Sequence, residues 1–215
     1  MATILLVTRP KHDLTTRYIS AWAQTVIDEA HTRGHSVLDL QGSRARRDVV
    51  ESMLTKQKPP LLFFNGHGND HCVTGHNNEV LVAAGRNEGI LQGALVYALS
   101  CKSAKVLGVQ SVQSGTRTYI GYSEDFVFLI TTEKQTRPVE DRLAALFLDP
   151  SNHVMLSLLK GHSAESAYLK ARHEYARTIQ KLLTSETSRD DTMVVRYLYW
   201  NMRHLVCHGD GRAVL

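Results

Sequence analysis

The stretch Pro60-Leu61-Leu62-Phe63-Phe64-Asn65-Gly66-His67-Gly68 decides the fold, because a short apolar run ends there in two glycines that bracket a histidine. A second apolar run, residues 93–99, ends in the same way at Ser100-Cys101. Both runs have the length and bulk of buried parallel strands rather than of helices. Parallel strands end at one edge of the sheet, where α/β proteins place their chemistry, so we expect His67 and Cys101 to share that edge.

The residues before this stretch alternate between strand and helix patterns. Strands are predicted at residues 3–7 and 36–40, and apolar side chains at helical spacing predict a helix between them that ends near Gly34. A second helix is predicted to start near Ser43 and to stop at Pro59-Pro60. This β-α-β-α-β order is the pattern of a parallel α/β sheet.

The residues after Gly68 are predicted to complete a single domain over residues 1–215. The patterns predict a polar loop at 69–78, a small strand at 80–82, a short helix at 88–92, the cysteine strand, a helix at 103–109 and a strand at 117–122. The part from about 138 to 206 is predicted to be helical, with segments at 142–147, 154–159, 163–183 and 190–206. We see no repeat, low-complexity tract or linker that would divide the chain.

The composition limits which binding partners and which cellular compartment are expected. The 25 basic and 21 acidic side chains leave a net charge of +4, which is a weak case for nucleic acid, and no such partner is expected. No apolar stretch approaches the roughly 20 residues of a membrane span, and residues 1–7 lack the basic start of a signal peptide. We therefore expect no membrane association. Three cysteines form no even disulfide framework, which fits a reducing, cytoplasmic location.

The paired histidine and cysteine predict acyl-transfer chemistry. A cysteine attacks a carbonyl carbon as the thiolate, so it needs a base beside it or a lowered pKa. His67 would be that base, and the start of the helix predicted after Cys101 would favour the thiolate through its N–H groups. The backbone N–H groups of Gly68 and Cys101 would form the oxyanion hole.

The motifs Asn65-Gly66-His67-Gly68 and Leu99-Ser100-Cys101-Lys102-Ser103-Ala104 resemble those of the clan CD, caspase-like cysteine peptidases. In that family one apolar strand ends in His-Gly and a later one ends in Cys. The resemblance is strongest to the CHAT branch, in which segments similar to residues 119–122, 159–167 and 171–172 follow. It implies a three-layer α/β/α sandwich with a mostly parallel central sheet, and a Cys101–His67 dyad that cleaves a protein substrate.

The resemblance also implies how such an enzyme is used. It suggests a role in bacterial defence or regulated cell death. CHAT proteins usually carry repeats or sensor segments, and none is visible here, so either a separately encoded regulator or a stand-alone effector is expected. No third catalytic residue is evident in the sequence, and the family often functions without one.

The sequence departs from metacaspases and caspases at the residues before the cysteine. Leu99-Ser100 replaces the Asp or Gln-Ala found there, so the acid that binds a basic P1 side chain in metacaspases is absent. Glu124 and Asp125 follow the next strand and offer a substitute. One of them, Asp125 by preference, would line the S1 pocket and pair with Lys or Arg; alternatively, both are solvated loop acids.

A metal site is the main rival interpretation of this region. His67, His71, Cys72 and His76 lie close in sequence, and zinc binds such ligands. The intervening glycines disfavour the helix that a His-x3-His site requires, and the Cys-x2-Cys pattern of structural zinc sites is absent. We therefore predict no metal and no other cofactor.

Two further alternatives lie outside catalysis. Cys101 and His67 could be a buried thiol and a strand-end histidine in an inactive caspase-like scaffold that docks partner proteins. A binding module of the flavodoxin or receiver type would need a phosphate loop or an acidic pocket after the first strand. Thr8-Arg9-Pro10 offers neither feature.

Overall fold

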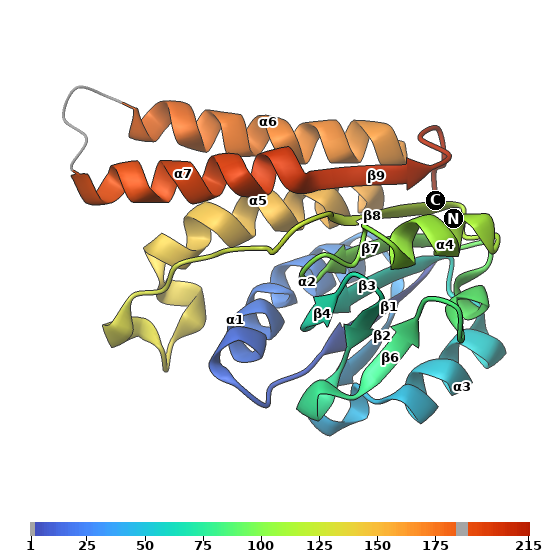
Figure 1. The fold of residues 1–215 in the computed structure, drawn as a ribbon. Coiled ribbons are helices and arrows are strands. Elements are labelled where there is room, and N and C mark those ends of the chain that lie inside the picture. Colours follow the sequence, from blue (N-terminus) through green and yellow to red (C-terminus); the bar gives the residue numbers. More distant parts are fainter. Residues whose placement is uncertain (1–2, 184–188) are drawn as a thin grey trace.

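The structure is a computed structural model that describes residues 3–183 and 189–215. Its central sheet has six strands in the order β2-β1-β3-β7-β8-β9. The strands are β1 Ile4–Arg9, β2 Ser36–Gln41, β3 Leu61–Asn65, β7 Leu95–Leu99, β8 Thr118–Tyr122 and β9 Leu205–Gly209. The first five in that order are parallel, and only the edge strand β9 runs antiparallel, against β8 (Figure 1). The predicted mostly parallel sheet is confirmed.

Helices cover both faces of this sheet. They are α1 Leu14–Trp22, α2 Gln24–Thr32, α3 Arg47–Gln57, α4 Leu107–Gln113, α5 Arg142–Leu159, α6 Ala164–Leu182 and α7 Arg189–His204, with short 3-10 turns at Gly42–Arg44, His76–Asn78, Glu88–Leu91, Thr132–Lys134 and Pro138–Glu140. Among the described residues, none of the helices is both long and apolar enough to cross a membrane.

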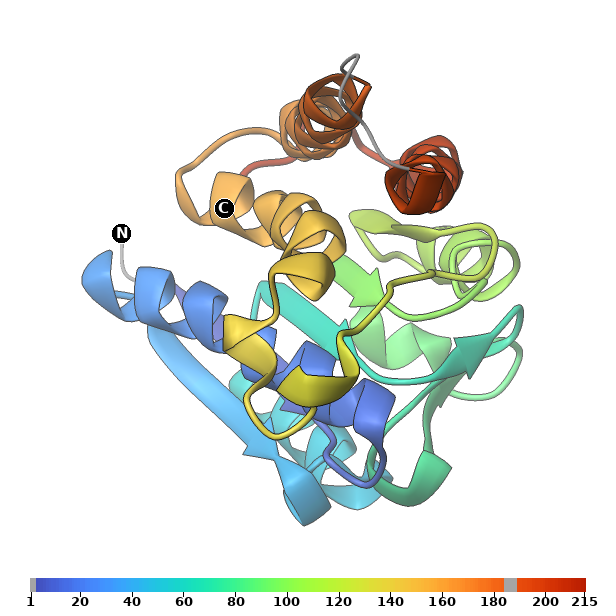
Figure 2. The ribbon, with the colours of Figure 1, turned by 90° about the vertical axis from the view of Figure 1, so that its left-hand side faces the viewer.

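The alternation of side chains along β3 explains the layers. Leu61 and Phe63 pack with α1, α2 and α5 on one face, while Leu62 and Phe64 pack with α3 and α4 on the other. All five residues of β3 are buried, as expected of a central parallel strand covered on both sides. The predicted three-layer α/β/α sandwich is therefore confirmed, and Figure 2 shows helices above and below the sheet.

The two last helices add an outer cluster next to α5. Val194 and Leu198 of α7 pack with Phe147 of α5 and Tyr175 of α6, and Phe126 and Phe128 from the segment after β8 join them. In Figures 1 and 2, α6 and α7 lie side by side at the top of the molecule. This cluster fixes the segment after β8, which lies next to the cysteine.

Several predicted elements differ from the observed ones because of long-range contacts. The helix predicted to run as far as Gly34 breaks at Ala23, since the Trp22 carbonyl accepts a hydrogen bond from Asn152 Nδ2 at 2.9 Å. The segments predicted at 142–147 and 154–159 form one helix that continues through Pro150. The last helix ends at His204, where the unpredicted strand β9 begins.

The predicted polar loop at 69–78 holds part of a second, small sheet. It consists of β4 Gly68–Asn69, β5 Cys72–Thr74 and β6 Val80–Ala83, all antiparallel. The small strand predicted at 80–82 is thus confirmed, and β4 and β5 were missed. Leu81 and Val82 pack into the same core as α3, so this sheet rests on the main one.

Candidate active site

The ends of β3 and β7 bring the two predicted catalytic segments together. Asn65 and Leu99 are register partners on neighbouring strands, so His67 and Cys101 both follow at the same edge. The two segments touch at Gly68: a Cβ placed there would lie 2.1 Å from Ser100 Oγ and 3.2 Å from the Cys101 carbonyl oxygen. Glycine is required at this position because the neighbouring backbone leaves no room for a side chain.

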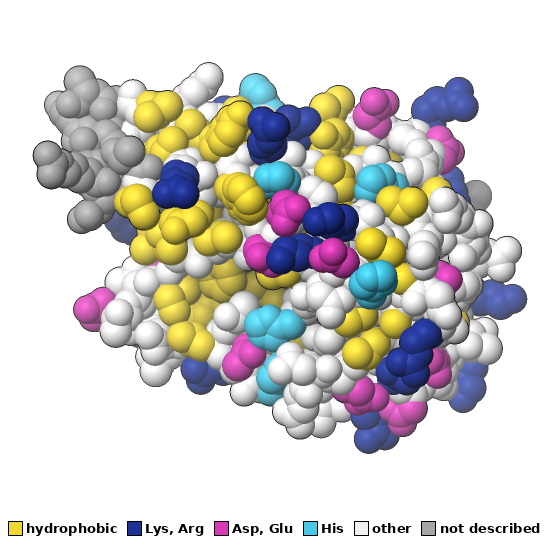
Figure 3. Space-filling model, viewed as in Figure 1, with side chains coloured by type: hydrophobic (Ala, Val, Ile, Leu, Met, Phe, Trp, Pro, Cys, Tyr) yellow, Lys and Arg dark blue, Asp and Glu magenta, His cyan; other side chains and the backbone are white. Residues whose placement is uncertain are grey.

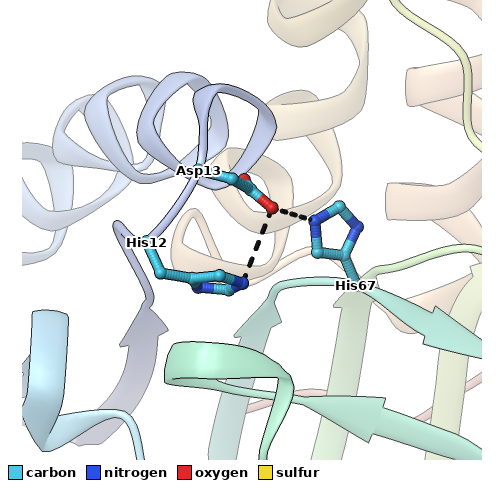
Figure 4. Close-up of side chains that lie close together, drawn as sticks. All are labelled: His12, Asp13 and His67. Carbon is cyan, nitrogen blue, oxygen red and sulfur yellow. Dashed lines mark hydrogen bonds and ion pairs between the residues drawn. The ribbon is translucent and has the colours of Figure 1, made fainter.

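The His67 imidazole is held by a carboxylate that the sequence reasoning did not identify. His67 Nε2 lies 2.6 Å from Asp13 Oδ2 (Figure 4). Asp13 caps α1, because its Oδ1 accepts the Thr16 N–H at 2.7 Å. No third residue beside the predicted pair was evident in the sequence, and the structure places Asp13 there, because β1 lies beside β3 and the turn after β1 brings Asp13 to the same edge.

The charge of Asp13 determines the tautomer of His67. Burial favours a raised pKa for the carboxyl, but hydrogen bonds from the Thr16 N–H and from His67 outweigh it and lower the pKa to about 2. At neutral pH the carboxylate is ionised and can only accept hydrogen bonds. The His67 tautomer that donates to this carboxylate has its proton on Nε2, and Nδ1 of that tautomer carries the lone pair.

A second histidine reaches the same carboxylate. His12 Nε2 lies 3.5 Å from Asp13 Oδ2, so the two imidazoles approach Asp13 from different sides (Figure 4). Edge-on ring contacts join His12 to His67 and to His76, with ring centroids 5.9 Å and 5.5 Å apart. His12 comes from the turn after β1, and its side chain is only 11% exposed.

The environment of Cys101 differs from the prediction. The chain after Cys101 forms turns, and α4 begins only at Leu107, so the predicted helix start beside the thiol is wrong. The thiol is half-buried, and burial raises its pKa, with a further contribution from the charge of Asp125. Its hydrogen bond, at 3.9 Å, goes to the Phe126 carbonyl oxygen. Within the described residues, no hydrogen bond joins Cys101 to His67.

The reason for the delayed helix is local. Lys102 has a left-handed backbone with φ of 56°, a conformation that does not continue into a helix. Its N–H donates to the Glu124 carbonyl at 3.1 Å, and the Ala104 N–H donates to the Tyr122 carbonyl at 3.1 Å. These bonds tie the turn after Cys101 to the end of β8.

The predicted oxyanion donors are not engaged in the surrounding sheet. The Thr74 N–H donates to the His67 carbonyl at 2.9 Å. Hydrogen-bonded and non-hydrogen-bonded pairs alternate along an antiparallel ladder, so the next pair, Gly68 and Val73, is non-hydrogen-bonded. The Gly68 N–H consequently points away from β5. In the described part of the chain, the Cys101 N–H has no hydrogen-bond partner. Both groups are thus free to bind another acceptor.

The two predicted substrate-binding acids lie beside Cys101 and are each paired with a lysine. Asp125 Oδ2 is 3.2 Å from Lys102 Nζ, and Glu124 Oε1 is 3.2 Å from Lys105 Nζ. The Asp125 side chain is 56% exposed. A cationic ligand that binds Asp125 would have to displace Lys102. The assignment of either acid to an S1 pocket stays a prediction.

The segment after Asp125 is extended and apolar. Residues 126–130 are half-buried, and the backbone N–H and C=O of Val127 are both bonded to the Asn201 side chain, at 3.0 Å and 2.6 Å. No backbone partner for Phe128 is found among the described residues. Figure 3 shows a hydrophobic hollow on this face with histidine and charged side chains along its rim.

The four residues of the rival zinc site do not come together. Cys72 is buried in β5, and burial raises the pKa of its thiol. His71 is exposed in the preceding turn. In the part of the chain that the structure describes, the group of histidine, cysteine or acidic side chains close enough to share a metal ion is His12, Asp13 and His67.

Comparisons with known proteins establish the fold. No protein-family profile matches the sequence, and no curated protein matches it either. The structure is similar to that of the Arg-specific cysteine proteinase gingipain R, with a TM-score of 0.63 and 8% identity, over 99% of this chain and 47% of that one. A complex of the pro- and mature domains of the Porphyromonas gingivalis gingipain RgpB matches with a TM-score of 0.63 and 9% identity, over 99% and 48%.

The chain spans about half the length of the gingipain chains that it matches. At such low identity the likeness concerns the fold alone: the chain has the caspase-like fold of the clan CD cysteine peptidases. The predicted caspase-like fold is confirmed. The matches support no particular branch of it, and neither matched structure is described as a CHAT protein.

Proposed function

We propose that the protein is a cysteine endopeptidase in which Cys101 is the nucleophile, His67 the general base and acid, and Asp13 the residue that orients His67. The observation that carries this proposal is the 2.6 Å bond from Asp13 to His67 Nε2. It leaves a lone pair on Nδ1 at the edge where Cys101 follows the neighbouring strand. A base held by a third group beside a nucleophile is the arrangement that acyl transfer requires.

In the proposed reaction, His67 Nδ1 accepts and returns one proton in each half of the cycle. The Cys101 Sγ attacks the carbonyl carbon of the substrate while its proton passes to His67 Nδ1. The carbonyl electron pair moves to oxygen, which the Gly68 and Cys101 N–H groups stabilise. The intermediate collapses as the leaving amine takes the proton from Nδ1. Water, deprotonated by the same nitrogen, then attacks the thioester carbonyl carbon. The C–S bond breaks, and Cys101 Sγ takes the proton back from Nδ1.

The raised pKa of Cys101 is compatible with this mechanism. The thiol is neutral at rest, and the transfer to Nδ1 occurs when the substrate arrives, since catalytic hydrogen bonds commonly tighten only in the complex. The same property, together with the absence of a Cys101–His67 hydrogen bond in the described residues, favours the second candidate function. That candidate is an inactive caspase-like scaffold that docks partner proteins.

The finer features of the proposal rest on the sequence motifs. We assign the chain to the CHAT branch, with a protein substrate, a separately encoded regulator and a role in bacterial defence or regulated cell death. Its three cysteines are free, which suits the reducing cytoplasm that the proposal assumes. A basic P1 residue, as in the Arg-specific gingipain, would take the place of Lys102 on Asp125.

The proposal is tested with fluorogenic peptides that differ at P1 and with the full chain. We expect cleavage of at least one peptide, with the strongest activity on Arg or Lys at P1. Cys101→Ala should reduce cleavage to background without changing the melting temperature. Cys72→Ala is the matched control and should retain activity, because Cys72 is buried in β5. Cleavage that survives Cys101→Ala would rule out the assignment.

A further inference from the structure

The cluster formed by His12, Asp13 and His67 has more ligand atoms than the peptidase mechanism uses. The ligand atoms of the three residues all lie within 4.8 Å of one another. The mechanism needs Asp13 and His67 but gives His12 no task. His12 is nearly buried, and its ring is oriented by edge contacts with His67 and His76. His12 Nε2 lies 3.5 Å from Asp13 Oδ2 and 3.2 Å from Asn78 Oδ1, so a metal ion would have to replace the contact with Asn78.

We propose that His12 Nε2, Asp13 Oδ2 and His67 Nε2 form a binding site for a zinc-like divalent transition metal, and that the bound metal switches the peptidase off. Zinc in proteins uses such a ligand set: two imidazole nitrogens and one carboxylate oxygen, with water in the fourth position. The inhibitory part of this inference rests on the proposed function. The binding part does not.

The distances require only a small adjustment. Zinc–ligand bonds of about 2.0–2.2 Å in a tetrahedral arrangement set ligand atoms roughly 3.3 Å apart. The separation from His12 to Asp13 is 3.5 Å and already fits, whereas the separation from Asp13 to His67 is 2.6 Å and must widen. Asp13 and His67 are 39% and 36% exposed, so both can move and water can reach the ion.

Coordination of His67 explains the inhibition. The ion occupies Nε2, so the proton of that nitrogen moves to Nδ1. A ring in this tautomer has no lone pair for the Cys101 proton. The metal therefore removes the base and its orienting carboxylate together.

Metal binding is tested on the Cys101→Ala protein, which excludes coordination by the catalytic thiol. We expect zinc to bind one ion per chain in competition with a chromophoric chelator, and Co²⁺ to give the visible absorption bands of a tetrahedral site. His12→Gln should weaken zinc binding by about 100-fold, since loss of even an outer-shell partner costs roughly 10–100-fold. His71→Gln removes an exposed histidine outside the cluster and should bind as the parent does.

Inhibition is measured separately on the chain with Cys101 intact. Zinc should abolish cleavage and a chelator should restore it. His12→Gln should raise the inhibitory zinc concentration by a similar factor, with inhibition measured relative to that variant's own metal-free rate. Absence of saturable zinc binding, or equal binding by the His12→Gln and His71→Gln proteins, would overturn the site. A protein that binds zinc through His12 but cleaves nothing would contradict the proposed function alone.

Discussion

The two strand ends that carry His67 and Cys101 are neighbours, yet they are equipped differently. On the histidine side, Asp13 holds the imidazole at 2.6 Å and fixes its tautomer. On the cysteine side, burial and the charge of Asp125 raise the thiol pKa, and no helix starts until Leu107. Under the proposed function, the difference means that activation of the Cys101 thiol depends on the histidine side. Changes there should have the largest effects on catalysis.

The largest effect is expected from Asp13→Asn. The amide cannot hold the His67 proton on Nε2 as the carboxylate does, so we expect kcat/KM to fall by about 10²–10⁴-fold. Stability at neutral pH should fall by only about 1 kcal/mol, because Asn is as good an N-cap as Asp and only the effect of the charge is lost. The measurement is peptide cleavage together with thermal unfolding.

Asp28→Asn is the matched control for the loss of one negative charge, since Asp28 is exposed on α2. It should leave the activity unchanged. If the Asp13→Asn protein is as active as the Asp28→Asn protein, catalysis does not depend on the Asp13 carboxylate.

Gly68→Ala tests the contact between the two strand ends. The new Cβ would lie 2.1 Å from Ser100 Oγ and 2.7 Å from the Cys72 carbonyl oxygen. We expect a loss of about 1–3 kcal/mol in the free energy of unfolding, and a lower melting temperature. Gly89→Ala is the control, because nothing lies within 4 Å of a Cβ at that position. Equal melting temperatures for the two variants would mean that the strand ends are not in contact.

Lys102→Met tests whether Asp125, on the cysteine side, binds a basic P1 residue. Removing the ammonium group releases Asp125 and also removes a competitor for a cationic P1 residue. We expect cleavage after Arg or Lys to rise a few-fold relative to cleavage after a neutral residue, because exposed ion pairs contribute little. Lys105→Met, which releases Glu124 instead, is the control. If only Lys105→Met raises this ratio, Glu124 and not Asp125 binds P1.

The smallest effect concerns stability at acidic pH. The pKa of Asp13 falls from 3.8 to about 2 on folding, so its ionised form stabilises the protein above about pH 4, and this stabilisation is lost as the pH falls from about 4 to about 2. We expect about 1 kcal/mol, a value discounted for the 39% exposure of the side chain. Denaturant unfolding of wild-type and Asp13→Asn proteins should converge across this range. A constant difference would mean that Asp13 is not stabilised by His67 and Thr16.

The structural features that were predicted correctly from the sequence depend on short, regular patterns. The buried runs that end at Asn65 and Leu99 have the composition of central strands, so the sheet and the shared edge of His67 and Cys101 followed from them. The helix capped by Ser163 was predicted for the same reason, because the cap is local.

The features that were not predicted depend on contacts between residues far apart in the sequence. Asp13 meets His67 only because β1 lies beside β3, although Asp13 carries a local signal as the cap of α1. The helix predicted after Cys101 fails because Lys102 is tied to the end of β8. Strand β9 is defined by its pairing with β8. In each case the deciding hydrogen bond joins segments that no local pattern connects.

The most direct test of the central claim is the rate at which iodoacetamide modifies each cysteine at neutral pH. Burial raises the pKa of all three thiols, so only a base beside one of them can make it selective. We predict that Cys101 reacts faster than Cys72 and Cys207, and that His67→Ala removes this advantage. Equal, slow modification of all three thiols, or a Cys101 rate unchanged by His67→Ala, would contradict the account.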